Sequence, residues 1–119
     1  MRASRGEIKI EEILTEAGLN FKMEVAFENL RSSNARPLRF DFCVYDDDGN
    51  IDFLIEYQGR QHYEPSSKFG GKKGLDQQQY NDKKKRRFCQ LNGLKLIEIP
   101  YWEENLINYD YIINKAYGN

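Results

Sequence analysis

The chain has 119 residues, the length of one domain, and we expect a single domain over residues 1–119. Hydrophobic residues make up 39% and charged residues 31%, with 18 basic and 19 acidic side chains, which excludes a disordered polyelectrolyte and a uniformly basic nucleic-acid coat protein. No apolar run approaches the roughly 18 residues that span a bilayer, and residues 1–6 lead into a charged amphipathic segment instead of a signal peptide. We therefore expect a cytoplasmic protein with no membrane partner.

The near-zero net charge conceals an uneven distribution along the chain. Residues 60–95 carry 10 basic and 3 acidic side chains, a net charge of +7, whereas residues 1–59 and 96–119 are both acidic. The basic block contains an uninterrupted run at residues 83–87. Such a run predicts either a surface that faces nucleic-acid phosphates or a solvated helix face, and charge alone favours neither.

The first third of the chain predicts a helix and a strand. Ser4 and Glu7 form a capping-box pattern, and apolar residues then recur at helical spacing, which predicts a helix over residues 5–17. Apolar and polar residues alternate over residues 21–27, the pattern of a half-buried strand. Residues 29–37 are expected to form a polar loop.

The remaining chain predicts a hairpin, a helix, a strand and a closing helix. Two largely buried strands, 38–45 and 51–57, flank a turn-forming segment. A glycine-containing irregular segment follows, and then we expect a helix over 75–92, a strand over 94–99 and a short helix towards residue 117. The order α-β-β-β-α-β-α predicts an α/β or α+β fold in three layers, with a central mixed sheet flanked by helices.

Acidic side chains occur within the predicted hairpin. Asp41 lies in an apolar strand, where a carboxylate costs several kcal/mol unless it is paired. On the adjoining strand, Glu56 and Gln58 are two residues apart and leave the same face. Carboxylates at close range repel unless a cation lies between them, and a hard divalent cation is the simplest solution. The alternative is an ordinary ion pair with Arg39 or Arg60.

These residues resemble a known nuclease signature. Phe40-Asp41, followed after the hairpin turn by Ile55-Glu56-Tyr57-Gln58, is similar to the bipartite motif of the PD-(D/E)xK nucleases, whose restriction-endonuclease-like fold has the αβββαβ core. Phe40 stands where that motif often has proline, and Gln58 stands where it has lysine.

The resemblance continues over about residues 4 to 104. The later segments that carry it are Gln58–Glu64, Phe69–Gly71, Asn81–Cys89, Asn92–Gly93 and Ile97–Trp102. They are similar to the phage-encoded EDxHD nucleases, relatives of very-short-patch mismatch repair endonucleases and of a group of homing endonuclease catalytic domains. The resemblance implies that the site residues are Glu7, Asp41, His62 and Asp82, with Glu56 and Gln58 keeping the older motif. It also implies a protein of the bacterial cytoplasm or of a phage-infected cell.

For three of these residues, a structural interpretation competes with a role in the site. Glu7 is also the capping partner of Ser4. His62 is the only histidine and suits a general acid or base, since the unperturbed pKa of a histidine side chain lies near neutrality. Its alternative is an ordinary polar residue, and its position beside the carboxylates favours the site role. Asp82 would hold His62 in one tautomer, or would form an exposed pair with Arg86 one helical turn away.

We therefore expect a metal-dependent DNA endonuclease in which Asp41 and Glu56 bind Mg²⁺, with Mn²⁺ as a substitute. The alternatives are a non-catalytic nucleic-acid-binding module on the same scaffold and a structural protein with an acidic cluster. The basic residues expected to contact DNA phosphates are Lys72 and Lys73, in a flexible glycine-rich loop, and Lys83, Lys84, Lys85, Arg86 and Arg87. No separate DNA-reading domain is recognisable, so high specificity would need a partner chain, a missing segment or many subunits, as in a homo-oligomer.

Overall fold

The computed structural model describes residues 3–118, so Met1, Arg2 and Asn119, at the ends of the expected domain, lie outside the described residues. The helices are α1 (Arg5–Glu16), α2 (Gly71–Leu91) and α3 (Tyr109–Tyr117), and the strands are β1 (Asn20–Arg31), β2 (Pro37–Tyr45), β3 (Ile51–Gln58) and β4 (Leu96–Pro100). Three short 3-10 helices are η1 (Arg60–His62), η2 (Ser67–Phe69) and η3 (Tyr101–Leu106). The predicted order of helices and strands is confirmed.

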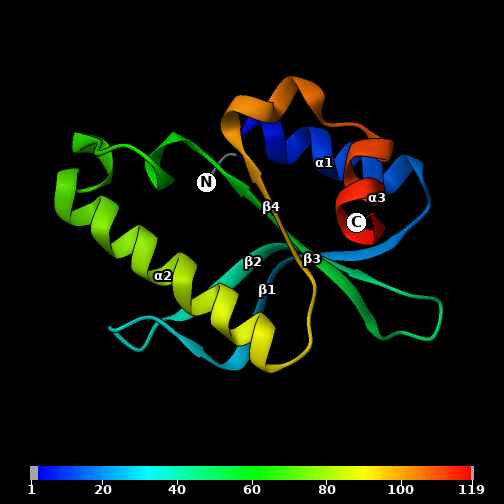
Figure 1. Cartoon of the computed structure of the whole chain (residues 1–119), viewed down its shortest axis with the longest axis horizontal. Coiled ribbons are helices and arrows are strands. Elements are labelled where there is room, and N and C mark those ends of the chain that lie inside the picture. Colours follow the sequence, from blue (N-terminus) through cyan, green and yellow to red (C-terminus); the bar gives the residue numbers. More distant parts are fainter. Residues whose placement is uncertain (1–2, 119) are drawn as a thin grey trace.

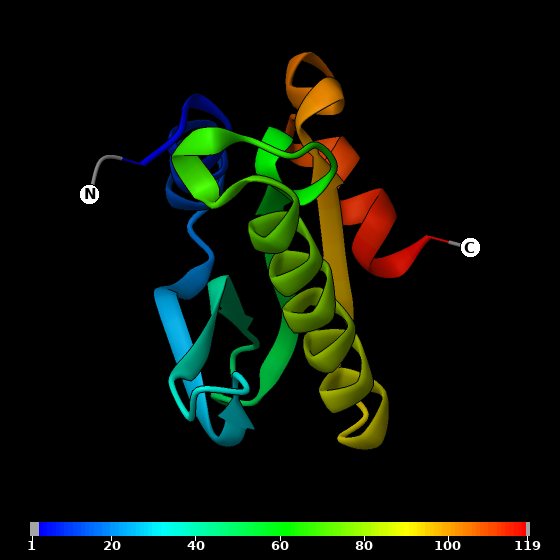
Figure 2. The same cartoon turned by 90° about the vertical axis from the view of Figure 1, so that its left-hand side faces the viewer.

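The four strands form one mixed sheet in the order β1-β2-β3-β4. The first three strands pair antiparallel, and β4 pairs parallel to β3 after the α2 crossover. Helices α1 and α3 lie on one face of the sheet and α2 lies on the other (Figures 1 and 2). The predicted α+β architecture in three layers is therefore confirmed.

Each face of the sheet has its own apolar core. The core under α1 and α3 consists of Ile10, Leu14, Phe42, Val44, Phe53, Ile55, Tyr57, Ile97, Ile99, Ile107 and Ile112. The smaller core under α2 consists of Leu30, Leu38, Phe40, Cys43, Leu54 and Cys89. Alternate residues of a strand point to opposite faces, so Glu56 and Gln58 follow Leu54 onto the α2 face.

Strands β1 and β2 change faces halfway along their length. Phe42 packs in the core under α1 and α3, whereas Phe40, two residues earlier, packs in the core under α2. On β1, Phe21 and Val25 divide in the same way. The change occurs at Glu24, whose φ of 54° lies in the left-handed region, which is uncommon for a residue other than glycine. The strand prediction for residues 21–27 is confirmed, but its single buried face is wrong because the strand turns at Glu24.

Two predicted boundaries are corrected. Strand β1 extends to Arg31, because buried Leu30 adds to the core under α2, so the loop is shorter than the predicted 29–37. Helix α2 begins at Gly71, which places Lys72 and Lys73 in its first turn and not in a flexible loop. A Cβ atom on Gly74 would lie 1.7 Å from the carbonyl oxygen of Phe69, so only glycine allows this close start of the helix.

None of the helices within residues 3–118 combines the length and apolar character needed to cross a bilayer.

Candidate active site

The sheet divides where β2 separates from β3. The last β2–β3 pair is Phe42 with Ile55, whereas β3 continues alongside β4 as far as Gln58 and Pro100. Beyond the division, the backbone N–H of Tyr57 donates to Oδ2 of Asp41 at 2.8 Å instead of to a β2 carbonyl. This bond holds the Asp41 carboxylate at the division of the sheet.

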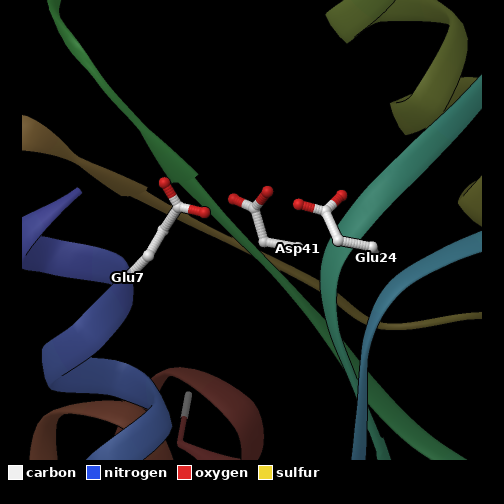
Figure 3. Close-up of side chains that lie close together, drawn as sticks. All are labelled: Glu7, Glu24 and Asp41. Carbon is white, nitrogen blue, oxygen red and sulfur yellow. The ribbon is translucent and has the colours of Figure 1, made fainter. Parts of the chain in front are cut away.

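Three carboxylates converge at this point. Glu7 of α1, Glu24 of β1 and Asp41 of β2 each offer a ligand atom, and these atoms lie within 4.8 Å of one another. Figure 3 shows the three side chains pointing towards a common space. The β1–β2 register explains the arrangement, since Met23 pairs with Phe42 and Val25 with Phe40, which sets Glu24 opposite Asp41. We call Glu7, Glu24 and Asp41 the carboxylate cluster.

Glu7 forms the capping box expected from the sequence and also lies at the converging carboxylates, while its role in a metal site stays a prediction. Its backbone N–H donates to Oγ of Ser4 at 3.2 Å and its carboxylate accepts from the Ser4 N–H at 3.3 Å, so the capping box is confirmed. The same carboxylate reaches the cluster. Gly6 allows this position, because a Cβ atom there would lie 2.2 Å from the ring of Tyr57 on β3. The close approach of α1 to β3 thus brings Glu7 to Asp41.

The carboxylate cluster lacks a compensating positive charge. Burial, then the charge of Glu56, then that of Glu7 raise the pKa of Asp41 to about 9, against the lowering effect of the Tyr57 N–H. Within residues 3–118, Asp41 forms no ion pair with a basic side chain, and Arg60 pairs instead with Glu64 at 3.7 Å. The alternative interpretation of Asp41 as an arginine-paired residue is therefore wrong.

Glu56 has a different partner from the one expected. Nζ of Lys85 donates to Oε1 of Glu56, and both side chains are about nine-tenths buried. Burial raises the pKa of Glu56, and the Lys85 ammonium counteracts this rise. Asp41 and Glu56 were the predicted metal ligands. Within the described residues, the carboxylates whose ligand atoms converge are instead Glu7, Glu24 and Asp41. Glu56 lies beside Asp41 and is bound to Lys85.

The assignment of Lys85 to the DNA-contacting run is wrong, because Lys85 is buried under the helix. The buried residues of α2 are Asp82, Lys85 and Cys89. Their spacing of three and four residues is that of one helix face, so the sequence contained a signal for the position of Lys85. Glu24, by contrast, had only its register opposite Asp41 as a signal.

His62 and Asp82 form the predicted contact. Nδ1 of His62 lies 2.9 Å from Oδ2 of Asp82, and the His62 side chain is only 10% exposed. Gln78 donates to the other Asp82 oxygen at 3.1 Å. Because a carboxylate only accepts hydrogen bonds, it places the proton of neutral His62 on Nδ1 and leaves Nε2 as the acceptor. The alternative pairing of Asp82 with Arg86 is wrong, since the Nε of Arg86 bonds both oxygens of Glu98 at 2.9 Å.

Gln58, expected among the catalytic residues, is engaged at both ends of its amide. Its Oε1 accepts from the hydroxyl of Tyr63, and its Nε2 donates to Oε1 of Glu98 at 2.7 Å. The side chain is buried. Gln58 therefore holds Tyr63 and Glu98 in place. The ammonium group near Glu56 comes from Lys85 instead.

A small cavity of about 170 Å³ lies between β3 and α2, lined by Gln58, His62, Tyr63, Gln79, Asp82, Lys83 and Arg86. Of the basic residues predicted to contact DNA, five are exposed along α2: Lys72, Lys73, Lys83, Arg86 and Arg87. Arg86 is paired with Glu98, and Nζ of Lys72 lies 3.5 Å from Oδ2 of Asp76. Lys84 is partly buried and donates to the carbonyl of Arg31 at 2.5 Å. The exposed part of the run thus adjoins the cavity that contains His62.

Comparison with known proteins finds similar segments in three viral proteins. The chain is 51% identical over 57 residues to uncharacterized protein 094L of frog virus 3 (isolate Goorha), a segment covering 46% of this chain and 37% of the viral protein. It is 41% identical over 65 residues to uncharacterized protein 307L of invertebrate iridescent virus 6, covering 54% and 33%, and 48% identical over 48 residues to uncharacterized protein 033L of invertebrate iridescent virus 3, covering 40% and 25%. The match spans about a third of the length of these relatives. No protein-family profile and no solved structure matches the chain.

Proposed function

We propose that this chain is a metal-dependent DNA endonuclease of the PD-(D/E)xK type. The observation that carries the proposal is the convergence of Glu7, Glu24 and Asp41 where β2 separates from β3. The Glu56–Lys85 pair lies beside this cluster, and Asp82 places a further charge near Glu56. Carboxylates, a buried lysine and an oriented histidine together suit the hydrolysis of a phosphodiester.

The donor set fits a hard divalent cation. Mg²⁺ and Mn²⁺ prefer carboxylate oxygens. Burial, and after it the charges of Glu56 and Glu7, raise the pKa of Asp41, and no basic side chain within residues 3–118 forms an ion pair with it. Glu7, Glu24 and Asp41 would hold the ion. When bound, Mg²⁺ supplies polarisation of the scissile phosphate and offsets charge on the leaving oxygen.

The side chains around the cluster would perform the proton transfer and the charge stabilisation. Nε2 of His62 accepts a proton from the attacking water, and Asp82 orients the ring through Nδ1. The nuclease motif has a lysine at the position of Gln58. In this chain, Lys85 of α2 would supply that positive charge. Lys72, Lys73, Lys83 and Arg87 would bind DNA phosphates, which adds affinity without sequence choice. The proposal keeps the expected cytoplasmic location.

The proposal is tested by cleavage of supercoiled plasmid in Mg²⁺ and in EDTA. We expect the protein to convert the plasmid to nicked or linear forms only in Mg²⁺. His62→Ala should lower the rate by roughly 10²–10⁴ at saturating metal, and Asp41→Asn should abolish cleavage. Asp47→Asn, an exposed acid of the β2–β3 turn, is the matched control and should cleave at the rate of the unmodified protein.

The other candidate functions give different results. Salt-dependent DNA binding without cleavage in Mg²⁺ or Mn²⁺ would indicate the non-catalytic binding module. If Asp41→Asn cleaves at the unmodified rate, the carboxylate cluster is not the active site.

The coupling of His62 and Asp82 has its own test. If the two residues act as one unit, the double variant loses much less cleavage rate than the product of the two single losses.

A further inference from the structure

We propose that Tyr63, Tyr101 and Trp102 form a stacking platform for an unpaired nucleobase, so that the substrate of the nuclease is a single-stranded DNA segment. The inference rests on the proposed function for its catalytic consequence, but the binding event it describes does not require cleavage. We call these three residues the aromatic platform.

The rings of the aromatic platform are close to one another. Tyr63 and Trp102 are exposed, and Tyr101 is partly buried against the core under α1 and α3. The centroids of Tyr63 and Trp102 are 4.7 Å apart, and those of Tyr101 and Trp102 are 5.3 Å apart. Tyr63 is 36% exposed and Trp102 is 60% exposed. A single exposed apolar side chain is common on a protein surface and needs no explanation. A group of neighbouring exposed aromatic rings is typical of a binding surface.

Buried and charged side chains hold the platform in place. The Tyr63 hydroxyl donates to buried Gln58, which is itself fixed by Glu98. The Tyr101 hydroxyl donates to Glu64 at 2.9 Å, and the Arg60 guanidinium lies 5.1 Å from the centroid of the Tyr101 ring. Trp102 itself is held through its ring contacts with Tyr63 and Tyr101. The fixed position of exposed rings lowers the entropic cost of binding a flat ligand.

The surroundings identify that ligand as a base attached to phosphates. Tyr63 follows His62 directly in the chain and lines the same cavity, together with Lys83, which forms no ion pair within residues 3–118, and Arg86, which is paired with Glu98. A flat π-system next to positive charge matches a nucleotide, whose base stacks on an aromatic ring while its phosphate contacts lysine or arginine. A base within a duplex is already stacked on its neighbours, so the platform favours an unpaired one.

The experiment uses Trp102, the only tryptophan of the chain, as its own reporter. The protein is titrated in EDTA with an oligothymidylate and with an abasic oligomer of equal length and charge, while tryptophan fluorescence is recorded. We expect quenching and the tighter binding with the oligothymidylate alone. An equal fluorescence change and equal affinity with the abasic oligomer would overturn the platform.

A matched pair of variants locates the effect. With a fluorescein-labelled oligothymidylate and anisotropy as the readout, Trp102→Ala should bind about 5- to 150-fold more weakly, the usual range for one stacked base. Leu106→Ala, which removes an equally exposed apolar side chain of η3, should bind as the unmodified protein does. Equal affinities of Trp102→Ala and the unmodified protein would also overturn the platform.

The substrate preference is then measured in Mg²⁺ with a blunt duplex and with the same duplex carrying a single-stranded flap. We expect faster cleavage at the flap, and we expect Trp102→Ala to reduce that preference. Equal cleavage of both DNAs would overturn the substrate assignment. Stacking in EDTA without any cleavage in Mg²⁺ would instead overturn the proposed nuclease function and leave the platform intact.

Discussion

The two faces of the sheet are built on different principles. The core under α1 and α3 consists of apolar side chains and of Tyr57. The α2 face is apolar at one end, and at the other it contains the four buried polar or charged residues of the described chain: Glu56, Gln58, Asp82 and Lys85. Burial of apolar surface stabilises without specific partners, whereas a buried charge destabilises unless its partner is present. The first face therefore serves stability. The candidate site combines the buried polar end of the α2 face with Glu7, which α1 brings to Asp41.

The strongest test of this difference is Lys85→Met, which leaves the Glu56 carboxylate buried without its partner. We expect a loss of about 3–5 kcal/mol in the free energy of unfolding, measured by urea denaturation. The double variant with Glu56→Gln should recover most of the loss. Lys83→Met, an exposed neighbour in the same run, should change stability by less than about 0.5 kcal/mol. A mild effect of Lys85→Met would mean that the ion pair is not buried in solution.

On the apolar face, the corresponding test is Leu14→Ala, since Leu14 of α1 is fully buried. Removal of its side chain should cost about 2–5 kcal/mol through lost apolar contacts and a residual cavity. No charge is involved, so the loss should be the same at pH 5 and pH 8. A loss that changes with pH would show that the two faces are electrostatically coupled.

The pH dependence of stability distinguishes the faces further. The pKa of Asp41 is about 9 in the folded chain and 3.8 when unperturbed, so between these values the folded state binds more protons than the unfolded state. Stability in EDTA should therefore fall as pH rises from about 4 to 9, with Asp41 contributing at most about 1.4 kcal/mol per pH unit. Asp41→Asn should remove that contribution and raise the melting temperature at pH 8. An unchanged pH profile in the variant would show that Asp41 is ionised throughout.

The smallest expected effect on stability concerns backbone strain. Glu24→Gly relieves the left-handed conformation but adds flexibility to the unfolded chain, so the net change should lie within about 1 kcal/mol. Calorimetric titration should nevertheless show weaker Mn²⁺ binding. Ala35→Gly, at the other described non-glycine residue with positive φ, is the control and should leave Mn²⁺ binding unchanged. Equal Mn²⁺ affinities in both variants would show that Glu24 does not bind the ion.

Local patterns explain how much of the molecule could be predicted. The capping box, the alternation over residues 21–27, the turn-forming segment of the hairpin and the helix-ending glycines depend on neighbours within a few residues. The order of helices and strands therefore followed from the sequence. The contact of His62 with Asp82 was also predicted, although it rested on the motif resemblance and not on periodicity. The errors in the buried face of β1 and at the start of α2 both arose where a backbone in the left-handed region changes the local direction of the chain.

The sequence by itself therefore determined the order of helices and strands, the three-layer class and most of the candidate residues. Only the tertiary structure decided which of them meet. The bend at Glu24 brings that residue to Asp41, and the rotation of α2 turns Lys85 towards Glu56 while Lys83 stays exposed. Both outcomes depend on groups far apart in the chain. Exposed Glu24 reaches Asp41 through the pairing of β1 with β2, whereas buried Lys85 pairs with Glu56 because a buried charge without a partner carries a high desolvation cost.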